Sequence, residues 1–377
     1  MSPQRSAVRR GRSAPVVAVI GAAGLPGTAV TRALVERAGE PGGPRRVIGV
    51  DESRGPVDGA VWRIADVCSP AVAGCLSGVD VIVHVATPSS LTEELARPAA
   101  ARRERAVRAA QAVATAAAAV GAQRLVGVTS AMVFGASPDN PVPLPDDAAV
   151  RARMDDGQVG DLLDVEDVLC RAPSLGTGLE LTLVRPAALV GPGVDTVVTR
   201  HFEAPRLLTV RGAAGAWQFC HLEDLGEAVA TAVLHRLGGP LTVGCEGTLP
   251  GDEVERLSGM RRLELPSALA FGTAERLHRI GVLPTPGTDL AFVVHPWAVS
   301  SRRLREAGWS PRYDNAACLA QVLAEVDGRH AVAGRRLERR DAALGAAGAA
   351  VALVGTAAVL RQARSRHARR TRNDDLR

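Results

Sequence analysis

The 377-residue sequence contains no lysine, and all 45 of its basic side chains are arginine. It has a single tyrosine, Tyr313, and aromatic residues make up only 3% of the chain. The lack of lysine excludes a Schiff-base lysine and a phosphate-binding loop of the Gly-Lys type. A tyrosine acid or base is excluded at every position before Tyr313. The hydrophobic residues, 46% of the chain, must therefore build a core mainly from Ala, Val and Leu.

Positive charge is concentrated at the two ends of the chain. Residues 1–13 hold four arginines and no acid, and residues 328–377 hold twelve arginines and four acids. The intervening body holds 29 arginines and 36 acidic residues. An acidic body with basic ends excludes a basic nucleic-acid platform and favours an anionic surface as the partner of the tail.

The six cysteines form no CxxC pair, and no histidine lies beside them at metal-ligand spacing. This pattern predicts reduced core thiols in a cytoplasmic protein without a metal site. The basic N-terminus leads directly into a strand and a Gly-rich turn, so we expect no cleavable signal peptide.

Strand and helix patterns alternate along the first half of the chain. Short apolar runs predict strands at 15–20, 47–50, 61–65, 79–85, 124–129 and 179–184, and helices at 29–37, 92–120 and 160–172. This alternation predicts an α/β fold with a doubly wound parallel sheet of the Rossmann type. We expect a disordered N-terminus at 1–14, a dinucleotide-binding domain at 15–185 and a smaller, non-contiguous lobe at 186–327. The lobe should contain short helices near 222–236, 264–280 and 314–326.

An Arg-rich tail, 328–377, contains 19 consecutive uncharged residues at 342–360. The run is long enough to span a bilayer, but its alanines and glycines give little transfer free energy. We expect membrane association, a plain surface helix, or a helix that packs on a partner through its small residues.

The sequence Gly21-Ala22-Ala23-Gly24-Leu25-Pro26-Gly27 follows the first strand and opens the first helix. Glycines permit a tight turn there, and the free N–H groups of the helix attract a pyrophosphate. Asp51 closes the next strand, where a carboxylate accepts hydrogen bonds from ribose hydroxyls and repels a 2′-phosphate. We therefore predict a dinucleotide site that prefers NAD to NADP.

In this context the chain resembles the extended short-chain dehydrogenases/reductases, the NAD-dependent epimerases/dehydratases. The resemblance covers about residues 15–326, and its segments are GAAGLPG at 21–27, ADV at 65–67, VDVIVHVAT at 79–87, RLVGVTSAMVFG at 124–135, RPAALVGPG at 185–193 and QFCHLEDL at 218–225. It implies an NAD site formed by Gly21, Gly24, Leu25, Gly27, Asp51, Asp66, Val67, His84, Val85, Ala86, Thr129 and Pro186.

The catalytic residues of that family are mostly missing. Its Ser matches Ser130, which either hydrogen-bonds a substrate oxygen or simply caps a strand end. Its Tyr-x-x-x-Lys pair falls on Gln158 and Leu162, and neither side chain transfers protons near neutral pH. The Arg that often binds the diphosphate of sugar nucleotides falls on Trp217.

Three other groups are candidates for acid–base chemistry. Asp161 and Asp164 lie on the helix that normally carries the Tyr–Lys pair, although a solvated helix face is the interpretation we favour for them. His221 is an acid or base by residue type, but a packed, hydrogen-bonded histidine is the favoured reading.

Two functions follow from the sequence: an atypical NAD-dependent oxidoreductase or epimerase with altered acid–base residues, or a non-catalytic NAD-binding regulator or scaffold. The expected partner of the site is a small-molecule substrate, and a homodimer is an alternative to a monomer.

Overall fold

A computed structural model describes residues 14–175, 178–213, 215–280, 283 and 285–327, together with the backbone of 331–332 and 335–336. The chain folds around a parallel seven-stranded sheet with the order β11-β6-β5-β4-β1-β2-β3. Its strands are β1 (Val16–Ile20), β2 (Arg46–Asp51), β3 (Val61–Ile64), β4 (Val81–Val85), β5 (Arg124–Val128), β6 (Glu180–Pro186) and β11 (Gly239–Val243). The predicted α/β fold with a parallel Rossmann-type sheet is confirmed.

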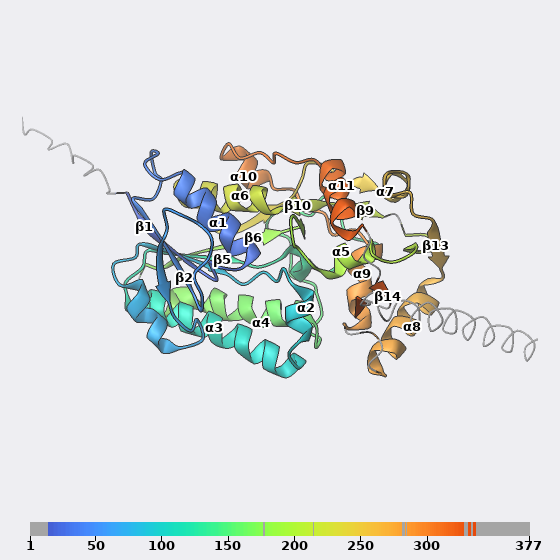
Figure 1. The fold of residues 1–377 in the computed structure, drawn as a ribbon, viewed down its shortest axis with the longest axis horizontal. Helices are drawn as coiled ribbons and strands as arrows, with labels where there is room; N and C mark the ends of the chain where they lie inside the picture. Colours follow the sequence, from blue (N-terminus) through green and yellow to red (C-terminus); the bar gives the residue numbers. More distant parts are fainter. Residues whose placement is uncertain are drawn as a thin grey trace, which may run out of the picture.

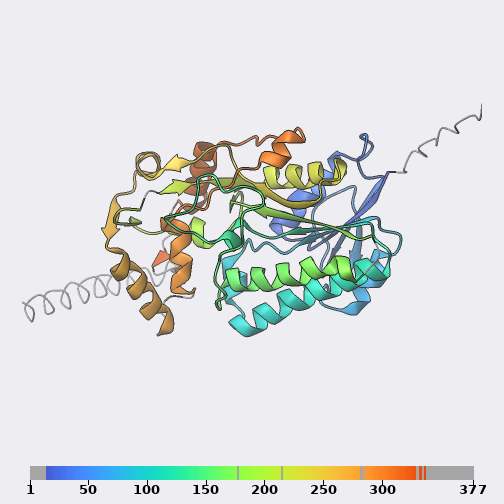
Figure 2. The same cartoon turned by 180° about the vertical axis from the view of Figure 1, so that it is seen from behind.

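Helices cover both faces of this sheet (Figure 1). One face carries α1 (Leu25–Glu36) and α6 (Leu222–Leu234), and the other carries α3 (Ala99–Ala119) and α4 (Gln158–Arg171), which run side by side in Figure 2. The central strands β1 and β5 are buried along their whole length, as expected for strands covered on both sides.

A smaller lobe lies at the carboxyl end of the sheet (Figure 1). It contains the short strands β7 (Ala188–Val190), β8 (Leu207–Val210), β9 (Ala216–Trp217), β10 (Phe219–His221), β12 (Leu249–Pro250) and β13 (Arg262–Leu265). Its helices are α5 (Val197–His201), α7 (Gly251–Ser258), α8 (Ser267–Arg279), α9 (Ala291–Val294) and α11 (Asn315–Val326). Helix α10 (Arg302–Glu306) instead lies beside α6 and contacts β11 of the sheet (Figure 1). A last pair of strands, β14 (Ala331–Val332) and β15 (Arg335–Arg336), is antiparallel.

Two elements differ from the sequence-based prediction. The helix expected over 92–120 is two helices, α2 (Leu91–Leu95) and α3, because Pro98 ends one and begins the other as an N-cap. Strand β11 was not predicted, since its apolar run is only three residues long and follows two glycines and a proline. It pairs with β6 and adds a seventh strand to the sheet.

Among the helices of the described residues, none is long and apolar enough to cross a membrane. The apolar run at 342–360 lies outside the described residues. Its role at a membrane or a partner surface therefore stays a prediction.

Candidate functional site

The Gly-rich turn joins β1 to α1 at the carboxyl edge of the sheet. Gly21 has a φ of 79°, which favours glycine, and its N–H donates to the carbonyl oxygen of Val50 at 3.0 Å. A Cβ on Gly27 would lie 1.8 Å from the carbonyl oxygen of Gly21, so helix α1 packs on the turn only with glycine there. A Cβ on Gly24 would meet one atom within 4 Å, at 3.8 Å, so the turn is open at this residue.

Asp51 supports the turn from the end of β2. Its Oδ2 accepts a hydrogen bond from the N–H of Ala23 at 2.8 Å, and its Oδ1 accepts one from the N–H of Glu52 at 2.7 Å. Asp66 accepts a hydrogen bond from the N–H of Cys68 at 2.9 Å. Both carboxylates thus shape the loops at this edge of the sheet.

A cavity of about 250 Å³ opens beside the turn, between the strand ends and helices α3 and α4. Five of the twelve residues predicted to hold the cofactor line it, namely Gly21, Val67, His84, Val85 and Ala86. The predicted Tyr and Lys positions, Gln158 and Leu162, line it as well. The other seven predicted cofactor residues, Gly24, Leu25, Gly27, Asp51, Asp66, Thr129 and Pro186, are not part of the lining.

His84, on β4, is 4% exposed, and neither ring nitrogen has a hydrogen-bond partner among the described residues. Burial lowers the pKa of His84 to about 4, so its imidazole is neutral at physiological pH. Burying an imidazole without a hydrogen-bond partner costs free energy. A polar ligand in the cavity that hydrogen-bonds the ring would remove this cost.

Helix α4 presents Gln158, Asp161 and Leu162 to the cavity. Asp161 differs from the solvated carboxylate that we expected, because it is 7% exposed and paired with Arg102 and Arg103 of α3. The Nε of Arg103 donates to Asp161 at 3.0 Å, and Arg102 also donates to the carbonyl oxygen of Asp156 at 2.7 Å. Asp164 is more exposed and lies 3.4 Å from Arg103.

Ser130 and Thr129 follow β5 but make structural contacts. The Oγ of Ser130 accepts a hydrogen bond from the N–H of Met132 at 3.2 Å and so caps a short 3-10 helix. Thr129 donates to the buried carboxylate of Glu166 at 2.6 Å, and Arg185 donates to the same carboxylate at 2.9 and 2.6 Å. A catalytic role for Ser130 stays a prediction.

His221 lies away from this cavity, at the start of α6. Its Nδ1 accepts a hydrogen bond from the N–H of Glu223 at 3.2 Å, and its ring stacks on Tyr313 at 3.8 Å between centroids. Asp224 accepts hydrogen bonds from the N–H groups of Arg312 and Tyr313 at 2.8 and 3.3 Å. These contacts fasten the closing segment of the lobe onto the sheet.

The sequence analysis missed Glu94, Arg97 and Arg102, which also line the cavity. Burial raises the pKa of Glu94, and the charge of Arg102, 3.7 Å away, opposes that rise. The three residues fell within one long predicted helix, so no sequence signal directed them to the cavity. The local signs of a separate helix α2 were Ser90, whose Oγ accepts a hydrogen bond from the N–H of Glu93, and Pro98.

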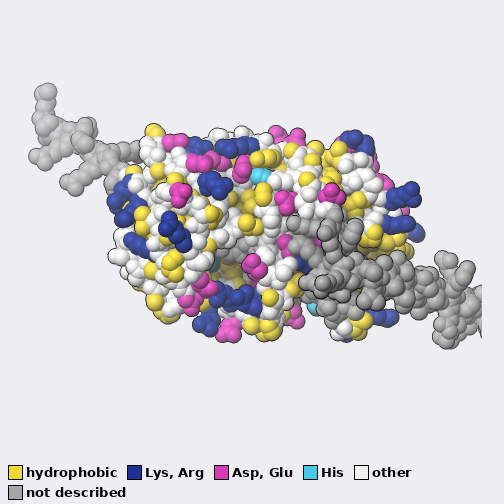
Figure 3. Space-filling view, in the orientation of Figure 1, with side chains coloured by type: hydrophobic (Ala, Val, Ile, Leu, Met, Phe, Trp, Pro, Cys, Tyr) yellow, Lys and Arg dark blue, Asp and Glu magenta, His cyan; other side chains and the backbone are white. Residues whose placement is uncertain are grey.

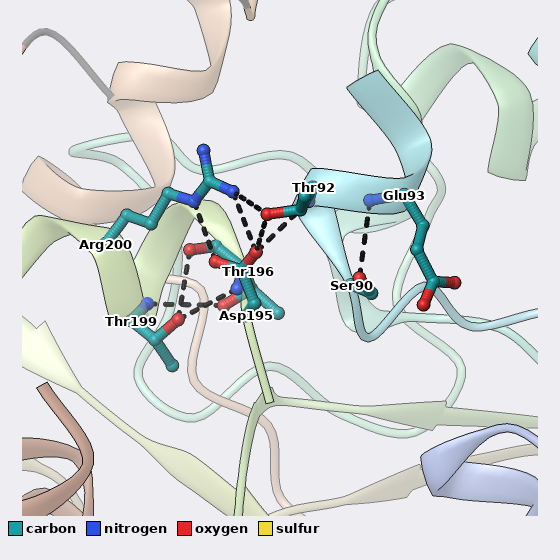
Figure 4. Close-up of polar contacts among 7 residues, drawn as sticks. All are labelled: Ser90, Thr92, Glu93, Asp195, Thr196, Thr199 and Arg200. Atoms are coloured by element: carbon teal, nitrogen blue, oxygen red, sulfur yellow. Dashed lines mark hydrogen bonds and ion pairs between the residues drawn. The ribbon is translucent and has the colours of Figure 1, made fainter. Parts of the chain in front are cut away.

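A buried cluster fixes α2 against the smaller lobe (Figure 4). Arg200 of α5 binds both oxygens of Asp195 at 2.7 Å each, and the Oγ1 of Thr92 donates to Asp195 at 2.9 Å. The N–H of Leu91 donates to the carbonyl oxygen of Asp195 at 2.6 Å. The position of Glu94 therefore depends on the Asp195–Arg200 pair.

Aromatic side chains surround Trp217, the position of the sugar-nucleotide Arg. Its ring centroid lies 5.5 Å from that of His201, 5.3 Å from that of Phe202 and 6.3 Å from that of Phe219. Trp217 lines a space of about 10 Å³ together with Phe292, and a separate cavity of about 340 Å³ together with His201 and Arg262. Burial lowers the pKa of His201 to about 4, so its imidazole is neutral, and Arg262 is paired with Glu255 at 2.6 Å.

Residues 17–154 match the model of the NAD dependent epimerase/dehydratase family. This segment contains the Gly-rich turn and most of the residues that line the cavity. The family resemblance predicted from the sequence is confirmed.

Similar proteins support the fold over a longer stretch. An uncharacterized protein of Mycobacterium tuberculosis (strain ATCC 25618 / H37Rv) is 25% identical over 254 residues, which cover 66% of this chain and 67% of that protein. The crystal structure of gox2253 has a TM-score of 0.64 at 19% identity and covers 83% of this chain and 98% of that chain. The structure of the dTDP-glucose 4,6-dehydratase from Streptomyces venezuelae, with NAD and TYD bound, has a TM-score of 0.60 at 19% identity. The match covers 83% of this chain and 97% of that chain.

Proposed function

We propose that the chain is an NAD-binding protein whose cofactor lies in the cavity beside the Gly-rich turn. The observation that carries this proposal is the open backbone at Gly24, directly before the free N–H groups of α1. Two further observations support it: His84 has unpartnered ring nitrogens at the cavity wall, and the related dehydratase binds NAD.

The residues of this chain have distinct roles in that complex. The turn at 21–27 would hold the pyrophosphate, Asp51 the adenine ribose, and Val67 the adenine side of the cavity. NAD supplies a hydride acceptor when it is bound. Gln158 and Leu162 line the cavity without a titratable group, so the proton transfer made by Tyr and Lys in the family has no counterpart at these positions.

The Gly24 observation gives a direct test. We expect Gly24→Leu to weaken NAD binding at least about 100-fold, since its side chain would fill the space left for the pyrophosphate. The melting temperature should be unchanged, because Gly24 has a φ of −66° and its Cβ direction is open. Gly27→Ala is the contrasting variant, and it should lower the melting temperature through its clash with Gly21. Unchanged NAD affinity in Gly24→Leu, measured by calorimetry, would refute the proposed site.

Asp51 should make the site prefer NAD to NADP by about tenfold or more, because its carboxylate repels a 2′-phosphate. Asp51→Asn keeps an oxygen for the N–H of Ala23 and removes the charge, so the preference should shrink. Calorimetry with both dinucleotides measures it, with the exposed Asp58→Asn as the control. Equal affinities in the unaltered protein would contradict this role of Asp51.

A second candidate function, an atypical NAD-dependent oxidoreductase, is favoured by Glu94. This carboxyl lines the cavity, where it can accept a proton from a bound substrate, and burial raises its pKa. Asp161 is hydrogen-bonded by two arginines and His221 caps α6, whereas Glu94 has a single arginine, Arg102, at 3.7 Å.

The role of Glu94 is tested by incubating the protein with NAD and pools of small hydroxylated metabolites and measuring the rate at which NAD is reduced. We expect Glu94→Gln to lower the rate about 100-fold or more, because general base catalysis supplies that factor. Glu93→Gln is the matched control, since Glu93 is its exposed neighbour on the same helix. Equal rates for Glu94→Gln and the unaltered protein would exclude Glu94 as the base, and no reduction by any pool would leave the non-catalytic NAD-binding function.

A further inference from the structure

A second, larger cleft adjoins the dinucleotide cavity. It has a volume of about 730 Å³ and shares Glu94, Arg97, Arg102 and Gln158 with that cavity. Helix α2 and the start of α4 form one wall, and His278 and Pro286 of the smaller lobe form the other. Figure 3 shows a hollow in this face of the molecule with arginine side chains gathered along its edge.

Among the described residues that line this cleft, one cation remains available for a ligand. Arg200 is bound by Asp195, and Arg102 is bound by Asp161. The guanidinium of Arg97 makes no ion pair or hydrogen bond with the described residues, and its charge acts on Glu94. Two acids, Glu94 and Asp156, also line the cleft, so a monoanion is favoured over a doubly charged phosphate.

Gln158 provides an independent observation. It is 8% exposed, its side chain lines both cavities, and it makes no hydrogen bond with the described residues. It is the first residue of α4, a helix of 14 residues whose N-cap, Gly157, supplies no side-chain hydrogen bond. The Gln158 amide is therefore available to a ligand in the cleft, and a helix N-terminus favours an anion.

The rest of the cleft is apolar. Its walls include Leu91, Leu95, Leu283 and Pro286. A carboxylate alone would leave most of the volume empty, whereas an apolar chain or ring attached to it would cover these side chains.

We propose that this cleft binds a small organic acid, with its carboxylate held by Arg97, Gln158 and the N-terminus of α4 and its apolar body held by the leucines. A guanidinium and a carboxylate form parallel hydrogen bonds, and the Gln158 amide adds a donor. This site deepens the proposed function and rests on it, because the cleft shares a wall with the dinucleotide cavity.

The experiment titrates the full-length protein with octanoate, with its neutral analogue octanamide and with inorganic phosphate, by calorimetry. We expect saturable binding of octanoate and at least about tenfold weaker binding of octanamide and phosphate. Arg97→Gln and Gln158→Leu should each weaken octanoate binding about tenfold or more. Arg108→Gln, an exposed α3 arginine outside both cavities, should leave it unchanged.

NAD affinity is measured on the same samples, so that the carboxylate site and the proposed NAD site are tested separately. Octanamide binding as tight as octanoate, phosphate binding as tight as octanoate, or full octanoate affinity in both Arg97→Gln and Gln158→Leu would overturn the carboxylate site. Protein that binds NAD but gives no heat with octanoate would overturn this inference alone. Protein that binds octanoate but not NAD would instead overturn the proposed function.

Discussion

Asp195→Ala is expected to destabilise the protein by about 3–5 kcal/mol, the cost of leaving one charge of a buried ion pair without its partner. Asp195 and Arg200 are both buried, at 4% and 7% exposure, and their two contacts are 2.7 Å long. The variant also removes the acceptor of Thr92, which fastens α2 to the smaller lobe. Urea unfolding at neutral pH measures the loss.

Asp167→Ala is the control for this prediction. Asp167 forms an exposed pair with Arg171 one turn along α4, and such pairs contribute about 0–1 kcal/mol. A loss below about 1 kcal/mol in Asp195→Ala would show that the pair does not hold the two parts of the chain together.

The second large effect concerns Asp289, a carboxyl that is 5% exposed and whose Oδ1 has no hydrogen-bond partner among the described residues. Burial, and then the charge of Asp155, raise the pKa of Asp289 to about 7, against 3.8 for an ordinary aspartate. Between these pH values the folded protein keeps a proton that the unfolded chain releases. The free energy of unfolding therefore falls as the pH rises from about 4 to 7, by roughly 4 kcal/mol in full.

Asp289→Asn should remove this dependence, because an amide does not titrate. The variant should match the unaltered protein at about pH 4 and exceed it in stability by roughly 4 kcal/mol at about pH 8. Urea unfolding across this pH range is the measurement, with the exposed Asp139→Asn as the control. A pH profile of stability that is identical in Asp289→Asn and the unaltered protein would contradict the buried, protonated carboxyl.

Local patterns were enough to predict six of the seven sheet strands, β1 to β6, and the Gly-rich turn. Spacing and backbone sterics within a few residues decide these structures. Examples are the apolar runs of β1 and β5 and the glycines at 21, 24 and 27. The absence of a Tyr–Lys pair on α4 was likewise predicted from the sequence, because the prediction depends only on which residues stand at 158 and 162.

The rest of the site depends on contacts between distant segments. Asp161 is buried by arginines on α3, and its partner Arg102 lies 59 residues away in the sequence. Glu94 reaches the cavity because Pro98 ends α2 and because Asp195, about a hundred residues later, fixes that helix. A helical period in the sequence shows neither where a helix is interrupted nor which distant residue binds a side chain. The burial of Asp161 and the place of Glu94 at the cavity are therefore seen only in the folded chain.

The central claim is that the chain keeps the cofactor half of an epimerase/dehydratase site and lacks the sugar-nucleotide half. Calorimetric titration of the full-length protein with NAD and, separately, with UDP-glucose in the presence of NAD tests both halves at once. We predict saturable binding of NAD and no measurable binding of UDP-glucose, because Trp217 stands where the family has a diphosphate-binding Arg and supplies no charged hydrogen-bond donors there. Absence of NAD binding, or tight binding of UDP-glucose, would contradict the account.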